Sequence, residues 1–328
     1  MRRSSVTEKG IASRSRQGRS LEYVACAARA ELVRDLRFQD VGLLKALIAY
    51  FQQERRMPLF AGSSATISYE QTGSGPDIVW VGGGGARGRD WQQFQTPHFD
   101  SAFRSTVFDN RGIGKTTSNV SPPWLIEDFA SDVAELVGGV CDGPVAFIGS
   151  SLGSAIVQQV AIDRPELVRC AIVMGSGAWS TGWGWDFQEA EIEFRKRGGT
   201  LDGMMGVTHY ASMLYPARAL GDRELWPRLK ELLLEWIESG DNEESLVPQW
   251  DASLRFDQRE RLRSVRVPVH VIAFAEDVQA PPQDGEELAG LIPTGEFHLL
   301  PGMGHGSWYG HAHREINPYI EGILRRYL

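Results

Sequence analysis

The stretch VAFIGSSLGSA, residues 145–155, decides the fold. It opens with the apolar run Val145–Ile148, which is typical of a buried strand, and continues into a helical stretch over Leu152–Asp163. Between them stands the pattern G-x-S-x-G with Ser151 at its centre. So sharp a strand-to-helix turn forces its middle residue into strained backbone angles, and the flanking glycines remove side chains that would collide. We therefore predict that the Ser151 hydroxyl is exposed at a helix N-terminus, where backbone N–H groups favour negative charge. The alternative is an ordinary Gly/Ser turn.

Strand and helix patterns alternate over most of the chain. Further β-rich runs stand at Thr66–Glu70, Ile78–Val81, Thr106–Phe108, Cys170–Met174, Val267–Phe274 and Glu296–Leu300. Further helical stretches stand at Ile126–Val137, Glu286–Leu291 and His313–Arg326. Strands that alternate with helices predict an α/β fold, with a mainly parallel sheet covered by helices on both faces.

Two segments depart from this alternation. Residues 176–261 are Trp-rich and helical, so we interpret them as an insertion into a core formed by residues 57–175 and 262–328. Residues 1–56 begin with a polar Arg/Ser-rich stretch and continue with apolar residues at helical spacing. This pattern predicts a partly disordered or helical extension. Met57 is a candidate internal translation start, so we expect this extension to be dispensable.

Composition and charge narrow the classes of function. The chain has 328 residues, 42% of them apolar, which is globular composition. Its net charge is -8, and residues 1–56 hold 12 lysines and arginines against 6 acidic residues, so the remainder, with 22 against 36, is strongly acidic. An acidic body argues against a nucleic-acid partner.

Neither export nor a membrane is indicated. The apolar run Val41–Phe51 contains Lys45 and falls far short of the roughly 20 residues that span a bilayer. The three cysteines, Cys26, Cys141 and Cys170, form no C-x-x-C pair, so neither a disulfide framework nor a zinc site is suggested. A reducing, cytoplasmic location fits these features.

A serine nucleophile requires a base, and one of the seven histidines stands in a suitable context. His305 lies in the glycine-containing loop 301–306, directly after the last predicted strand. His311 and His313 fall at the start of the terminal helix, where solvated or capping roles are the default. The other four, which include His270 and His298, read as surface or packed histidines. We therefore expect His305 to be the base.

An acid that orients the histidine is expected after an earlier strand. Val267–Phe274 is followed by Glu276 and Asp277, of which Asp277 is the better placed and Glu276 is the alternative. The order Ser151, Asp277, His305 along the chain is that of α/β-hydrolases, and differs from the orders in the trypsin and subtilisin types.

The glycine run Gly82–Gly85 after the strand Ile78–Val81 suits an oxyanion hole. Residues without side chains allow a backbone N–H to approach the reacting carbonyl oxygen. We favour Gly84 as donor beside the N–H of Leu152, and Gly83 stays an alternative.

The same glycines permit a different interpretation. Residues 83–88 match G-x-G-x-x-G, and Asp109 stands where the ribose-binding acid of a dinucleotide site would stand. Against this, Pro97 leaves too little chain for a full crossover helix, and Asp109 runs straight into a loop.

Residues 62–328 resemble an α/β-hydrolase of the ester and lactone hydrolase type. Four motifs carry the resemblance: Asp109–Gly114 as the D-x-R-G-x-G turn, Gly149–Gly153 as the elbow, Asp277–Pro281 as the acid loop and Gly304–His305 as the histidine loop. The departure is Gly82–Gly85, which stands in place of the family's His-Gly oxyanion segment. The resemblance implies no metal and no organic cofactor. It also argues against epoxide hydrolases and haloalkane dehalogenases, which have aspartate at the elbow.

In that family the insertion covers the serine as a lid. Six of the ten tryptophans lie in the insertion here. Trp183 and Trp185, in Gly-rich surroundings, are the candidates for lining an apolar substrate pocket, whereas Trp226 and Trp236 lie on an amphipathic helix and are expected to pack the lid.

The combined interpretation is a serine hydrolase that cleaves a carboxylic ester or lactone of a medium-sized, largely apolar molecule through Ser151, His305 and Asp277. A hydrolase of carbon–carbon bonds in β-diketone-like substrates uses the same triad and stays an alternative, as does a ligand receptor without turnover. The expected partner is the small-molecule substrate, with no nucleic acid and no membrane, and a homo-oligomer is compatible with the sequence.

Overall fold

A computed structural model of the chain describes residues 57–238 and 243–328. The predicted extension, residues 1–56, lies outside the described residues. The chain divides into the units Met1–Arg56 and Met57–Leu328, and the account below concerns the second.

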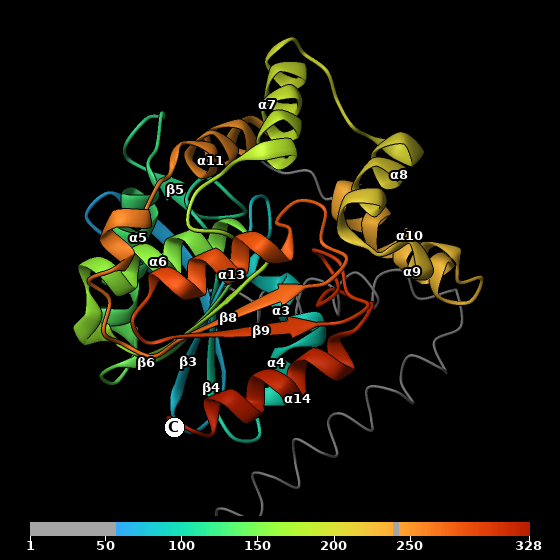
Figure 1. Ribbon diagram of the computed structural model, residues 1–328. Coiled ribbons are helices and arrows are strands. Elements are labelled where there is room, and N and C mark those ends of the chain that lie inside the picture. The colour runs from blue at the N-terminus through green and yellow to red at the C-terminus, as the bar shows by residue number, and fades with distance from the viewer. Residues whose placement is uncertain (1–56, 239–242) are drawn as a thin grey trace, which may run out of the picture. The chain divides into compact units, whose positions relative to one another are not determined.

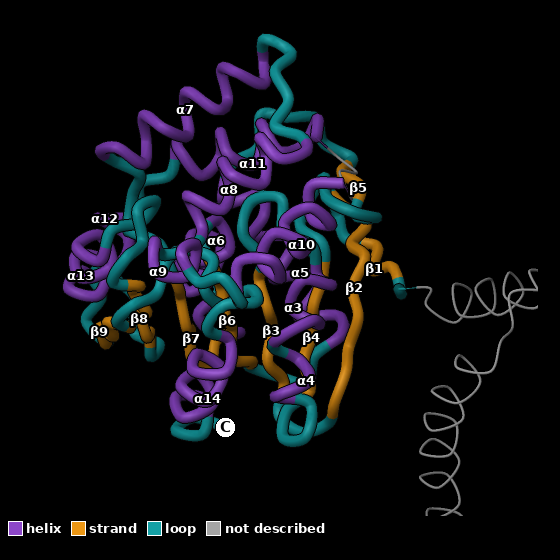
Figure 2. The backbone as a smooth tube through the Cα atoms, turned by 90° about the vertical axis from the view of Figure 1, so that its right-hand side faces the viewer, coloured by secondary structure: helices purple, strands orange, loops and turns teal. Residues whose placement is uncertain are grey.

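The described residues contain a nine-stranded sheet, ordered β1-β2-β4-β3-β6-β7-β8-β9, with β5 paired to β2 (Figure 2). The strands are β1 (Leu59–Ala61), β2 (Ala65–Gly73), β3 (Asp77–Val81), β4 (Arg104–Phe108), β5 (Thr117–Ser118), β6 (Val145–Ser150), β7 (Val168–Met174), β8 (Val269–Phe274) and β9 (Gly295–Leu300). Pairs from β4 to β9 are parallel, and the pairs that β2 forms with β1, β4 and β5 are antiparallel. The predicted α/β fold with a mainly parallel sheet is confirmed.

Helices cover both faces of this sheet (Figure 1). One face packs against α5 (Ile126–Val140), α6 (Leu152–Asp163) and α13 (Pro282–Leu291), and the other against α3 (Gly88–Phe94), α4 (Thr96–Phe99) and α14 (His313–Leu324). The central strands are buried on both sides because alternate side chains enter the two cores. Val79 and Phe147 lie in the first core, and Trp80 and Ile148 in the second.

The boundaries differ from the predicted ones at several places. α13 begins at Pro282, four residues before the predicted Glu286, because proline is tolerated in the first turn, where its missing N–H has no helical partner anyway. The short helices α3 and α4 and the strands β1 and β5 have too few residues to show a periodic pattern.

Between β7 and β8 the chain forms a group of helices that stands outside the layers of the sheet (Figure 1). These are α7 (Gly182–Lys196), α8 (Gly203–Leu214), α9 (Ala217–Gly221), α10 (Leu225–Glu238) and α11 (Glu243–Arg255). The short helix α12 (Arg259–Leu262) follows them and packs against α6 and α13, where Leu262 enters the first core. α8, α9 and α10 share a core of their own that contains Val207, Tyr215 and Leu229. A short 3-10 helix, Pro165–Leu167, joins α6 to β7.

Among the described residues no helix combines the length and the apolar character needed to cross a membrane.

Candidate active site

Ser151 sits at the turn between β6 and α6 with φ 55° and ψ -122°. Among the described residues it is the one non-glycine residue with positive φ, a conformation that L side chains rarely adopt and that costs about 1–3 kcal/mol. The Ser151 N–H donates to the carbonyl oxygen of Met174, at 2.9 Å, so the turn is fastened to the end of β7. The strained turn that the sequence predicts is therefore present at this serine.

The two glycines of the pattern are required by close backbone contacts. A Cβ at Gly149 would collide with the carbonyl group of Gly153, and one at Gly153 would overlap the carbonyl oxygen of Val81. α6 thus starts directly against β3 and β6, which is possible only without side chains at both positions.

His305 and Asp277 form a buried pair. The Nδ1 atom of His305 lies 2.8 Å from the Oδ2 atom of Asp277, and both residues are less than a tenth exposed. His305 comes from the loop after β9, and Asp277 from the loop after β8. Gly175, which follows β7, packs against the pair, since a Cβ there would lie 3.2 Å from each of these two atoms. Three strand ends therefore meet at the pair.

The structure brings Asp277, rather than Glu276, to the histidine. The second oxygen of Asp277, Oδ1, accepts hydrogen bonds from the N–H groups of Gln279 and Ala280, each at 2.9 Å. Glu276 is exposed, and its backbone N–H donates to Met303. A carboxylate with every oxygen satisfied holds the imidazole in one orientation with its Nε2 atom free to take a proton.

Gly83 and Gly84 line the same cavity as Ser151 and His305. A Cβ at Gly83 would lie 3.3 Å from the Cβ of Ser151 and 4.0 Å from its Oγ atom. Within residues 57–238 and 243–328, the N–H groups of Gly83, Gly84 and Leu152 donate no hydrogen bond to another protein group. All three are donors that an oxyanion near Ser151 could use, so the preference for Gly84 over Gly83 stays a prediction.

A buried glutamine that the sequence did not single out supports the glycine loop. Gln249, on α11, accepts a hydrogen bond from the Gly85 N–H at 2.9 Å and donates to the carbonyl oxygen of Arg111 at 2.8 Å. Asn110 donates to the carbonyl oxygen of Gly82 at 2.8 Å. Gln249 lies more than 100 residues along the chain from both Gly85 and Arg111, so no local sequence pattern could have indicated its role.

Asp109 has a structural task that excludes the ribose-binding interpretation. Its carboxylate is 5% exposed and accepts hydrogen bonds from the N–H groups of Gly88 and Lys115, at 3.0 and 3.2 Å. The acid that would face a ribose therefore closes its own loop against the start of α3.

A cavity of about 210 Å³ lies over Ser151 and His305. Aromatic side chains from the inserted segment form much of its wall, namely Trp179, Trp185, Phe187, Tyr210, Trp236 and Trp250. It also contains the carboxylates of Asp90, Glu191 and Asp284, and no lysine or arginine among the described residues that line it.

The two tryptophans selected from the sequence have different positions. Trp185 lines the cavity, as expected. The expectation for Trp183 is corrected, because this residue is 55% exposed, does not line the cavity, and stacks on Phe187 with 5.0 Å between ring centroids. Trp236, which we expected only to pack the lid, also reaches the cavity.

Comparison with known proteins agrees with this architecture. A family model described as "Alpha/beta hydrolase family" matches residues 78–318. A putative non-heme bromoperoxidase, BpoC, of Mycobacterium tuberculosis is 29% identical over 73% of this chain and 90% of its own length. A putative carbamate hydrolase, RutD, of Azorhizobium caulinodans is 26% identical over 80% of this chain and 95% of its own. The solved structure of Rv0554 from Mycobacterium tuberculosis covers 80% of this chain and 94% of that one, with a TM-score of 0.74 and 26% identity.

The fold is thus that of a hydrolase, with Ser151, Asp277 and His305 on loops at the carboxyl ends of parallel strands. The family match covers most of the chain, and the chain belongs to the alpha/beta hydrolase family. The roles of Ser151, His305, Asp277, Leu152 and Gly84 in a reaction stay predictions.

Replacement of Gly153 by alanine is expected to destabilise the protein by about 2 kcal/mol or more, because the new Cβ overlaps the Val81 carbonyl oxygen and drives α6 away from β3. Urea unfolding measures this loss. The matched control is Gly138→Ala, since Gly138 lies within α5 and a Cβ there meets nothing within 4 Å. That variant should be about 0.5–1 kcal/mol more stable through helix propensity. Equal stability of Gly153→Ala and wild type would show that the turn is not as tight as described.

Asp90 predicts a pH dependence of stability. Burial raises the pKa of its carboxyl to about 6 from the ordinary 3.8, although the N–H of Arg87 donates to it. The folded state therefore binds this proton more tightly than the unfolded state, and Asp90 costs stability increasingly as pH rises from 4 to above 6. We expect Asp90→Asn to gain up to about 3 kcal/mol relative to wild type at pH 8, with most of the gain lost at pH 3.5.

Denaturant unfolding of both proteins across this pH range measures the difference. Glu286→Gln is the control, since this carboxylate on α13 is exposed in the folded state and keeps its hydration. An Asp90→Asn advantage that does not change with pH would contradict the prediction.

Proposed function

We propose that this protein is a serine hydrolase that cleaves a carboxylic ester or lactone bond in an uncharged, largely apolar small molecule. One observation carries the proposal: Ser151, on its strained turn, and the hydrogen-bonded pair His305–Asp277 lie at the same aromatic cavity. A strained serine beside a base that is itself oriented by a buried acid is the arrangement that nucleophilic acyl transfer needs.

In the proposed reaction the Oγ atom of Ser151 attacks the carbonyl carbon while the Nε2 atom of His305 takes its proton. Asp277 stabilises the imidazolium that forms. N–H groups at Leu152 and Gly84 stabilise the negative charge on the carbonyl oxygen. His305 then protonates the departing alcohol, and a water molecule deprotonated by His305 releases the acyl group and restores Ser151.

The walls of the cavity support the choice of substrate. Its volume of about 210 Å³ is below the ≈ 300–1,000 Å³ of pockets that bind drug-sized ligands, which favours a substrate at the small end of the expected range. Aromatic side chains suit an apolar acyl or alcohol group. The described lining residues hold three carboxylates and no lysine or arginine. Glu191 is ion-paired with Arg195 at 3.5 Å, so Asp90 and Asp284 are the carboxylates that disfavour a substrate with negative charge.

The relatives define which acyl compounds a substrate panel should contain. One relative is described as a putative carbamate hydrolase, and carbamates react through the same attack on a carbonyl carbon. A panel of neutral aryl esters, lactones and carbamates, each with a carboxylate-bearing analogue of matched size, tests both the bond type and the charge preference. β-Diketones belong in the panel as the carbon–carbon alternative. A homo-oligomer and a cytoplasmic location stay predictions.

Replacement of Ser151 by alanine is expected to lower turnover of the best substrate by at least about 1,000-fold, since only binding and the oxyanion donors remain. Covalent labelling by a fluorophosphonate, detected by mass spectrometry of the intact protein, should also disappear. Ser150→Ala should still be labelled. Labelling that survives Ser151→Ala would assign the nucleophile to another residue, and an unlabelled wild type would favour a binding protein over an enzyme.

Replacement of Asp277 by asparagine is expected to lower the acylation rate by about 100-fold or more, because the imidazole loses its fixed tautomer and the charge that stabilises imidazolium. Stopped-flow measurement of the first turnover gives this rate. The matched control is Glu276→Gln, which changes the neighbouring exposed carboxylate and should leave the rate within about twofold. The opposite pattern would move the role to Glu276.

A further inference from the structure

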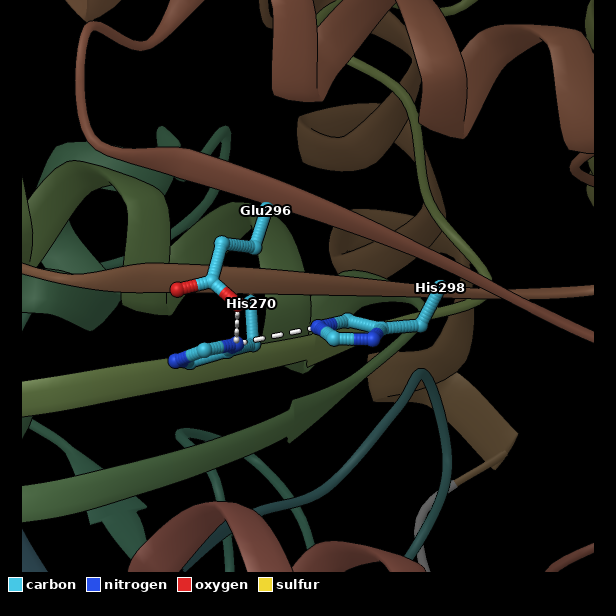
Figure 3. Close-up of side chains that lie close together, drawn as sticks. All are labelled: His270, Glu296 and His298. Atoms are coloured by element: carbon cyan, nitrogen blue, oxygen red, sulfur yellow. Dashed lines mark hydrogen bonds and ion pairs between the residues drawn. The ribbon is translucent and has the colours of Figure 1, made fainter. Parts of the chain in front are cut away.

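Two histidines and a glutamate converge on the neighbouring strands β8 and β9 (Figure 3). His270 is the second residue of β8 and pairs in register with Glu296 of β9. His298 follows Glu296 by two residues, so both side chains leave β9 on the same face. The three side chains therefore come together through the register of two parallel strands, and through no motif in the sequence.

Their distances fit one small cation. The Nδ1 atom of His270 lies 3.0 Å from the Nε2 atom of His298 and 3.6 Å from the Oε2 atom of Glu296. All three potential ligand atoms lie within 4.8 Å of one another. Two ligand atoms that each lie about 2.05 Å from a tetrahedral ion are roughly 3.3 Å apart. The His270–His298 and His270–Glu296 pairs would reach this spacing through shifts of a few tenths of an ångström.

The outer ring nitrogens are already held. The Nε2 atom of His270 lies 2.9 Å from the Tyr327 hydroxyl, and the Nδ1 atom of His298 lies 2.8 Å from the Tyr319 hydroxyl. A hydroxyl oxygen can accept from an imidazole N–H, and this would direct the lone pair of each inner nitrogen toward the centre of the cluster. Histidine ligands of metals are oriented by such outer partners in the same way.

We propose that His270, His298 and Glu296 form a binding site for a divalent transition-metal ion, best suited to Zn²⁺, with water in the fourth position. Two imidazoles and one carboxylate are a ligand set that zinc adopts in proteins. Magnesium and calcium are disfavoured because they prefer oxygen ligands.

Burial and charge around the cluster are compatible with entry of an ion. His270 is completely buried, so the cluster has one wall inside the protein. The Glu296 side chain is 44% exposed and gives access from solvent. Arg326 is the competing charge, since its guanidinium donates to both oxygens of Glu296, at 3.0 and 2.7 Å, but it is itself 48% exposed and can turn outward.

The site would act on the fold rather than on the proposed reaction. His270 lies ~13 Å along β8 from Phe274, the residue that ends the strand before Asp277, at about 3.3 Å per residue. An ion there would tie the edge strand β9 to β8, and through Tyr319 and Tyr327 to α14 and the C-terminal residues. No metal is expected from the sequence, where His270 and His298 are 28 residues apart.

The test uses the full chain, freed of metal by dialysis against a chelator and titrated with ZnCl₂ in competition with a chromophoric chelator. The expected result is tight binding of one zinc ion that His298→Gln and Glu296→Gln each weaken by more than about 100-fold. Zinc X-ray absorption should show two imidazole ligands. Tyr319→Phe keeps every ligand and is expected to bind about 10-fold more weakly, because one ring loses its outer partner.

The matched control is His98→Gln, which removes another histidine that is paired with a carboxylate, Glu321, at 2.8 Å, but has no second imidazole beside it. It should bind zinc as wild type does. Arg326→Gln should bind more tightly, since a competing positive charge is gone. Circular dichroism of each metal-free variant separates loss of a ligand from loss of fold. Zinc binding unchanged in both His298→Gln and Glu296→Gln, or no binding of Zn²⁺ to wild type at micromolar concentration, overturns the proposal.

Discussion

The left-handed backbone of Ser151 is the constraint on which the rest of the site depends. A serine at φ 55° persists only if its surroundings fix it, and here β6, β7 and α6 do so together. The absence of side chains at Gly149 and Gly153 lets α6 start in contact with β3. The same close contact places the glycine loop after β3 beside the serine, so the candidate nucleophile and the candidate oxyanion donors are positioned by the same packing of α6 against β3.

The second constraint is the burial of charge around the cavity. Asp277 is buried with each oxygen hydrogen-bonded, so its burial is compensated within the protein. Asp90 is less well compensated, and its raised pKa reflects that. The described lining residues thus combine carboxylates with aromatic surface, and the proposed preference for neutral substrates rests on this combination.

Strands β8 and β9 carry polar groups at both ends. Their carboxyl ends lead to Asp277 and His305, which form the buried pair beside the cavity. Their opposite ends carry the His270–His298–Glu296 cluster, which faces α14. Because β9 is an edge strand, it has hydrogen-bonded neighbours on one side only, and additional links to β8 and α14 at this end would limit its fraying.

The sequence by itself determined the α/β fold and selected Ser151, His305 and Asp277 as candidates, because turn chemistry and the order of elements along the chain can be read from local patterns. It could not separate Trp183 from Trp185, since the phase of α7 depends on how the helix packs. It gave no sign of Gln249 or of the His270–His298 pair, because contacts between residues far apart in the chain follow from strand register and helix placement. Those are set by the packing of the whole core, and only the tertiary structure decided them.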